Sequence, residues 1–93
     1  MEIPSIRSYG EYSSDNYGAN SLSVQFEDFT LYYSYSTIVA FRDRQEGLIV
    51  HKNDWGTTTG KHLNWIDGGC KRTRLPHEEF QKKLQAMLER HTK

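Results

Sequence analysis

The chain has 93 residues, enough for one domain with a single core, and its twelve basic residues balance twelve acidic ones. We therefore expect one domain over residues 1–93, without room for a second catalytic domain. A single cysteine excludes an internal disulfide, and no apolar run approaches the ~20 residues that span a bilayer. These features predict a cytoplasmic protein that is not embedded in a membrane.

The charges are unevenly placed along the chain. Residues 1–59 hold four Lys or Arg against eight Asp or Glu, whereas residues 60–93 hold eight against four. Such asymmetry can guide an acidic partner to one surface, although a helix with a solvated charged side produces the same count.

The N-terminal third predicts strands. Residues 6–19 mix tyrosines with glycines and serines, which is typical of a short strand and turn, and also of adaptable binding surfaces. Apolar and polar residues then alternate over 22–26 with the period of a half-buried strand. Glu27 and Asp28 follow as a tight turn.

The next apolar run is unusually long for a strand. Residues 29–41 are rich in aromatic and β-branched side chains and contain no glycine or proline. We expect a single strand with a bend or bulge near residues 34–37, because strands usually have about five or six residues. Residues 48–52 form the returning strand, so the predicted sheet is a meander of about four strands.

The C-terminal segment predicts a helix over residues 76–91. Pro76 suits the first helical position, and Glu78 and Glu79 oppose the positive end of the helix dipole. Five side chains at intervals of three and four form the packing face: Phe80, Leu84, Met87, Leu88 and His91. The predicted fold class is therefore α+β, a mainly antiparallel sheet with this helix packed on one face and a short helix near residues 58–66.

Residues 53–66 are the most distinctive stretch, because they hold both tryptophans, three consecutive threonines, a lysine and a histidine. A threonine hydroxyl can cap the first turn of a helix over 58–66, and the glycine pair at 68–69 can end it. Leu63 and Ile66 would share its buried side.

Two interpretations of this stretch stand side by side. In the structural one, Leu63, Trp65 and Ile66 are core residues and the threonines are caps and turn formers. In the functional one, Trp55 is a loop residue that stacks on a base beside a helix N-terminus that binds phosphate. The predicted ligand-binding residues are Trp55, Thr57, Thr58, Thr59, Gly60, Lys61, His62 and Asn64, and the additional phosphate contacts are Lys71, Arg72 and Arg74.

Catalysis and metal binding are not predicted. The segment from Gly56 to His62 departs from a P-loop in its spacing and lacks the Ser or Thr that holds magnesium. His62, Cys70 and His77 lack the paired spacing of zinc ligands. We therefore predict no cofactor and no enzyme activity.

The sequence also resembles a family of small proteins of unknown function carried by bacteriophages, prophages and archaeal viruses. The resemblance covers residues 9–20, 33–42, 55–64 and 74–80, and the element Thr-Thr-Gly-Lys-His-Leu-Asn at 58–64 is its most specific part. It implies a phage-linked cytoplasmic protein that binds a host protein, a nucleic acid or a defence-system signal nucleotide.

Together these observations predict a non-catalytic protein that binds nucleic acid or a nucleotide through Trp55 and the turn at residues 57–62. The alternative is a protein-interaction module, of the host-factor or defence-inhibitor type, which uses the tyrosine-rich N-terminal segment and a sheet edge. A homo-oligomer is compatible with both.

Overall fold

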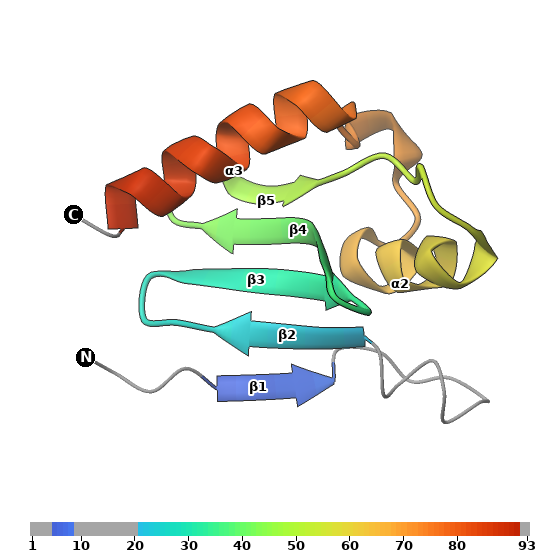
Figure 1. Cartoon of the computed structure of the whole chain (residues 1–93), viewed down its shortest axis with the longest axis horizontal. Coiled ribbons are helices and arrows are strands. Elements are labelled where there is room, and N and C mark those ends of the chain that lie inside the picture. Colours follow the sequence, from blue (N-terminus) through green and yellow to red (C-terminus); the bar gives the residue numbers. More distant parts are fainter. Residues whose placement is uncertain (1–4, 9–20, 92–93) are drawn as a thin grey trace.

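The computed structural model describes residues 5–8 and 21–91. Its five strands, β1 (Ser5–Ser8), β2 (Ser21–Gln25), β3 (Phe29–Ser34), β4 (Thr37–Asp43) and β5 (Gly47–Val50), form one sheet in chain order. Each strand pairs antiparallel with the next, as Figure 1 shows. The predicted α+β class with an antiparallel meander is confirmed.

The prediction of one long strand over residues 29–41 was wrong. The chain turns back after β3, where Tyr35 adopts a left-handed conformation with φ of 57°, and β4 then pairs with β3. This hairpin supplies the fifth strand. A shift of register after Tyr32 leaves Val39 as an extra residue in β4, whereas the bend or bulge was expected near residues 34–37, where the chain turns instead.

One face of the sheet is covered by α3 (His77–His91), as predicted. Phe80, Leu84 and Met87 of this helix form a buried core with Leu31 and Phe41. The helix runs along this face above β5 and β4 in Figure 1. Burial of these side chains is the main attachment of the helix, because apolar area removed from water dominates such packing.

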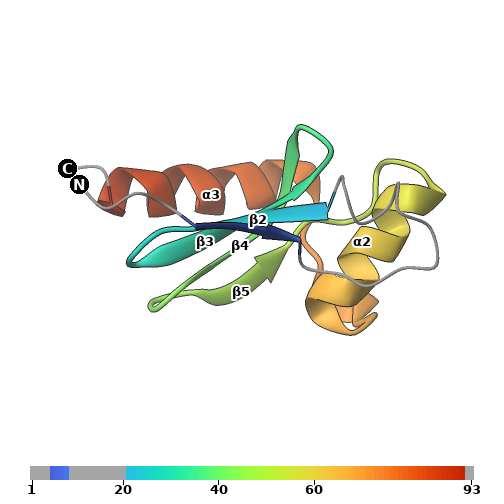
Figure 2. The same cartoon turned by 90° about the horizontal axis from the view of Figure 1, so that it is seen from below.

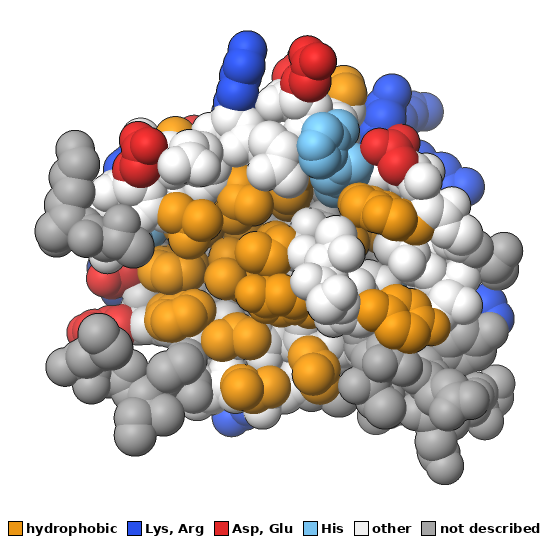
Figure 3. Space-filling model, in the orientation of Figure 1, with side chains coloured by type: hydrophobic (Ala, Val, Ile, Leu, Met, Phe, Trp, Pro, Cys, Tyr) orange, Lys and Arg blue, Asp and Glu red, His pale blue; other side chains and the backbone are white. Residues whose placement is uncertain are grey.

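The same sheet face continues beyond the helix. Ile6, Val24, Leu31 and Phe41 are register neighbours and therefore point to one side. Leu31 and Phe41 are buried, whereas Ile6 is 63% exposed. Figure 3 shows the resulting apolar patch over the sheet beside α3.

A second core cluster lies under α2 (Thr57–Asp67), which is near the end of the sheet and away from α3 in Figure 2. Leu63 is fully buried against Val39, Ala40 and Val50, and Ile66 is partly buried there. The prediction that Trp65 is core was wrong, because half of its surface is exposed.

The two ends of α2 differ in how well the sequence predicted them. The N-cap is Gly56, which makes no side-chain cap hydrogen bond, so the predicted threonine cap was wrong. The C-terminal end is as predicted: Gly68 adopts the left-handed conformation with φ of 68°, which glycine takes at low cost.

A buried carboxylate fastens the far end of α3. Asp43 of β4 accepts hydrogen bonds from Arg90 Nη2 at 2.6 Å and from the backbone amide of Glu46, also at 2.6 Å. The helix C-terminus is thus tied to the β4–β5 turn.

Among the described residues, no helix is long and apolar enough to cross a membrane.

Candidate functional site

A polar pocket of about 440 Å³ lies where three segments meet. These are the loop after β5, the outer side of α2, and the connection that contains the 3₁₀ helix η1 (Lys71–Thr73). Its lining residues are Lys52, Asn53, Asp54, Gly60, Asn64, Lys71 and Arg74. Four of the residues predicted from the sequence, Gly60, Asn64, Lys71 and Arg74, are thus brought together.

The loop is held in place by its own polar groups. Asn53 Oδ1 accepts a hydrogen bond from the Trp55 amide at 3.0 Å, and Asn53 Nδ2 donates to the Gly56 carbonyl at 3.3 Å. The Lys52 amide donates to the Leu75 carbonyl at 2.8 Å, which fixes the loop beside the end of η1. These hydrogen bonds lie within the protein, so this wall of the pocket is preformed and does not need a ligand.

Gly60 allows the loop and α2 to approach closely. A Cβ atom at this position would lie 3.0 Å from Asn53 Nδ2, which is too short for an ordinary contact. The absence of a side chain at Gly60 is thus part of the pocket geometry.

We expect Gly60→Ala to displace the Asn53 side chain and to shift the side-chain amide resonances of Asn53 and the backbone amide resonances of residues 52 and 53. Alanine favours the helix by up to about 1 kcal/mol, so the fold should persist. Gly56→Ala is the matched control, since a Cβ there meets nothing within 4 Å. Equal spectral changes in the two variants would contradict the close approach.

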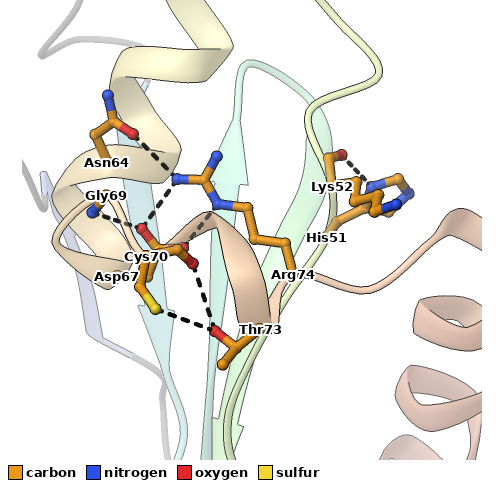
Figure 4. A network of polar contacts seen from close by, with 8 residues as sticks. All are labelled: His51, Lys52, Asn64, Asp67, Gly69, Cys70, Thr73 and Arg74. Atoms are coloured by element: carbon orange, nitrogen blue, oxygen red, sulfur yellow. Dashed lines mark hydrogen bonds and ion pairs between the residues drawn. The ribbon is translucent and has the colours of Figure 1, made fainter.

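Arg74 is the most constrained side chain in the pocket, with 4% of it exposed. Its Nε donates to Asp67 Oδ2 at 2.7 Å, and its Nη2 donates to Asp67 Oδ1 and to Asn64 Oδ1, both at 3.0 Å. A guanidinium has five N–H donors, and these bonds use three of them. Within the described residues Nη1 has no partner, and Figure 4 shows it turned away from Asp67.

The bond to Arg74 also orients the Asn64 amide. Because Asn64 Oδ1 accepts from Arg74, the other end of the amide is the Nδ2 donor group. In the described part of the chain neither Asn64 Nδ2 nor the ammonium groups of Lys52 and Lys71 has a hydrogen-bond or ion-pair partner. The lining is therefore rich in donors, a composition that fits an oxyanion.

Asp67 holds Arg74 in this geometry. Burial would raise the pKa of Asp67, but hydrogen bonds from Arg74 and from the Gly69 amide, with the charge of Arg74, outweigh it and lower the pKa below its ordinary value. Asp67 therefore stays ionised and balances the charge of Arg74. Of the other charged residues in the described lining, Lys52 and Lys71 are positive and Asp54 is negative. The net charge that remains is therefore one positive charge.

The other predicted residues whose side chains are described lie outside this lining. Thr59 and His62 are buried, and both hydrogen-bond the Ser34 hydroxyl, at 2.9 Å and 2.7 Å. They fasten α2 to the end of β3, which is a structural role. Thr58 is half-buried, and Lys61 and Arg72 are exposed. The side chain of Thr57 lies outside the described part of the structure.

Trp55 lies in the pocket loop but does not line the pocket. Trp55 is 40% exposed as a residue, and its ring contacts the His51 ring, with the centroids 4.6 Å apart. One side of the indole is thus supported while part of its surface remains open to solvent. This arrangement suits a stacking platform.

The sequence analysis did not predict Lys52, Asn53 and Asp54 as binding residues. An asparagine two residues before the amide that it binds is typical of a local turn, so the sequence could have indicated that Asn53 fixes this loop. The two neighbours enter the pocket because a parallel bridge pairs His51 with Leu75, a contact that local sequence does not show.

No group of three or more His, Cys, Asp or Glu side chains in residues 5–8 and 21–91 is arranged to hold a metal ion.

A model of a family of unknown function, DUF8033, matches residues 4–82. No curated protein and no solved structure matches the chain significantly.

Proposed function

The chain belongs to the DUF8033 family, whose function is unknown, and we propose that it is a non-catalytic module that binds a nucleotide or nucleic acid by a phosphate group in the pocket. The observation that carries this proposal is the buried Arg74 guanidinium. It is fixed by Asp67, it lines the pocket, and its Nη1 group has no partner among the described residues.

The donor set suits phosphate chemically. Hydrogen bonds from a guanidinium to an oxyanion are charge-assisted and are about twice as strong as neutral ones. Because Asp67 and Asn64 already hold Arg74, binding costs little side-chain ordering at this position. Lys52 and Lys71 line the pocket as well and add two exposed positive charges.

The pocket and its loop also suit the rest of a nucleotide. A volume of about 440 Å³ lies within the common range for small-ligand sites. Trp55 is in the same loop as three lining residues, so a base that leaves the pocket has a stacking surface nearby. A phage or prophage setting and a cytoplasmic location, implied by the resemblance and the composition, complete the proposal.

The proposal predicts that Lys52→Ala and Lys71→Ala each weaken binding without unfolding the protein, since both residues are exposed. Calorimetric titrations should use inorganic phosphate, a panel of linear and cyclic nucleotides, and single-stranded oligonucleotides. For an oligonucleotide, each substitution should reduce the slope of log affinity against log salt by about one. Lys82→Ala, an exposed lysine on α3, is the matched control.

Two results would contradict the proposal. One is the absence of binding across the whole panel at low salt. The other is an equal effect of Lys71→Ala and Lys82→Ala, which would show that general charge and not the pocket binds the ligand. Binding to mononucleotides but not to oligonucleotides, or the reverse, would identify the physiological source of the phosphate.

We predict a separate contribution from Trp55. Trp55→Ala should leave the fold intact and weaken nucleotide binding by about 1–3 kcal/mol, the usual contribution of one base stacked on an aromatic ring. Trp65→Ala is the control, because Trp65 is a half-exposed tryptophan on α2 that does not line the pocket. Fluorescence titration of both variants with the same nucleotide tests this, and equal losses would argue against stacking on Trp55.

The alternative is a protein-interaction module. Its tyrosine-rich segment falls mostly in residues 9–20, outside the described residues, and the sheet order leaves β1 and β5 as edge strands. Salt distinguishes the two proposals, since phosphate binding weakens steeply with salt and an aromatic protein interface does not.

A further inference from the structure

Two histidines join the pocket loop to the start of α3. His51, which directly precedes the loop, is 1% exposed. Its Nδ1 hydrogen-bonds the backbone carbonyl of Lys52, and its Nε2 lies 3.0 Å from Nδ1 of His77, the first residue of α3.

The carbonyl assigns the tautomers of both rings. A carbonyl oxygen only accepts, so His51 Nδ1 must carry a hydrogen, and Nε2 of the neutral ring is then an acceptor. His77 Nδ1 must therefore donate to it. In the neutral state each ring is protonated at Nδ1, and His77 Nε2 keeps its lone pair.

This arrangement limits how many protons the pair can bind. A first proton can bind at His77 Nε2, and the bond between the rings then becomes charge-assisted and stronger. A second proton must bind at His51 Nε2, where it would face the N–H of His77. Two donors cannot share a hydrogen bond, so the second proton breaks the contact.

The pair is coupled to the pocket by direct contacts. The Trp55 ring rests on His51 with centroids 4.6 Å apart, and Asp54 Oδ2 lies 4.0 Å from His51 Nδ1. Phe80 of α3 lies on the ring as well, with centroids 5.0 Å apart. A change in the position of His51 therefore reaches the loop that carries Lys52 and Asp54.

Within residues 5–8 and 21–91, charged residues adjoin the pair in sequence on both elements. The loop contributes Lys52 and Asp54, and the first turn of α3 contributes Glu78 and Glu79, which follow His77 directly. A doubly charged pair would repel itself, and Asp54 offers His51 an alternative partner at 4.0 Å.

We propose that the His51–His77 pair is a proton-operated latch on the pocket loop. The latch is closed when the hydrogen bond between His51 Nε2 and His77 Nδ1 is present, which is the case with no proton or one proton added to the two neutral rings. The second added proton breaks this hydrogen bond and so opens the latch. Its effect on ligand affinity rests on the proposed function, whereas the opening step itself needs no ligand.

The ligand-free test is a pH titration by nitrogen-detected NMR of the imidazole rings, from about pH 8 to about pH 5, where histidine changes charge. We expect both rings in the Nδ1-protonated tautomer at the upper end. Backbone amides of residues 52–56 should shift only when His51 Nε2 becomes protonated. A neutral His51 protonated at Nε2, or a loop that does not respond to His51, would overturn the proposal.

The binding test uses a thymine oligonucleotide, because its phosphodiesters keep their charge over this pH range. Charge alone predicts tighter binding of an anion as histidines become protonated. The latch predicts the opposite at the acidic end, a loss of about tenfold, which corresponds to one hydrogen bond.

His77→Gln separates the latch from general acid effects. Its amide can donate to His51 Nε2 but does not titrate, so binding at about pH 8 should be unchanged and the acidic loss should disappear. His91→Gln is the control, since His91 lies at the other end of α3 beside Asp43. An acidic loss that persists in His77→Gln would overturn the latch. If neither the oligonucleotide nor any nucleotide of the panel binds at any pH, the proposed function fails, and the NMR titration still decides the latch.

Discussion

Replacing Phe80 with alanine should lower the free energy of unfolding by about 3–5 kcal/mol, the range for large core aromatic residues. Phe80 has no exposed surface. Its ring lies 5.7 Å from the Phe41 ring and 5.0 Å from the His51 ring, measured between centroids, so the substitution opens a cavity between α3 and the sheet. Urea denaturation of both proteins measures the difference.

The neighbouring substitution Gln81→Ala provides the control, because this exposed residue should change stability by less than about 0.5 kcal/mol. Leu84→Ala should follow Phe80→Ala, with a loss of about 2–5 kcal/mol. A Phe80→Ala protein as stable as Gln81→Ala would show that α3 is not docked through this face.

Asp67→Asn should destabilise the protein by about 3–5 kcal/mol near neutral pH, because the buried Arg74 would lose its charged partner. Side-chain exposure is 4% for Arg74 and 5% for Asp67, so solvent cannot replace the lost interaction. Asp54→Asn is a suitable control, since 58% of the Asp54 side chain is exposed.

This effect should depend on pH in one direction. The folded-state pKa of Asp67 is lowered, so the stabilisation is fully present above the ordinary aspartate pKa of 3.8 and is lost as pH falls through the folded-state pKa. The difference between the wild-type protein and Asp67→Asn should therefore shrink in acid. Urea denaturation near neutral pH and below about pH 3 tests this, and a difference that stays constant would contradict the assigned role of the ion pair.

Much of the fold followed from local patterns. Alternation predicted β2, and the three- and four-residue spacing predicted α3 and its buried face. The hairpin between β3 and β4 was missed because its turn contains Tyr35 in a left-handed conformation, without the glycine or asparagine that usually signals one. The exposure of Trp65 was missed because apolar character alone does not reveal which side of a short helix is covered.

The pocket was only partly predictable, because its walls come from distant segments. Gly60, Asn64, Lys71 and Arg74 were found because they lie near one another along the chain. Burial of Thr59 and His62 was not foreseen, since it depends on the Ser34 hydroxyl, which lies 25 and 28 residues away in sequence.

The most direct test of the phosphate pocket is an NMR titration of the wild-type protein that follows the side-chain amide of Asn64 and the guanidinium of Arg74. Oligonucleotide or nucleotide is added at low salt, with inorganic phosphate as the simplest probe. We predict saturable shifts of the Asn64 Nδ2 and Arg74 Nη1 signals that are larger than those of Gln81 and Arg90, which lie on α3. Binding that leaves the Asn64 and Arg74 signals unchanged would contradict the assignment of this pocket.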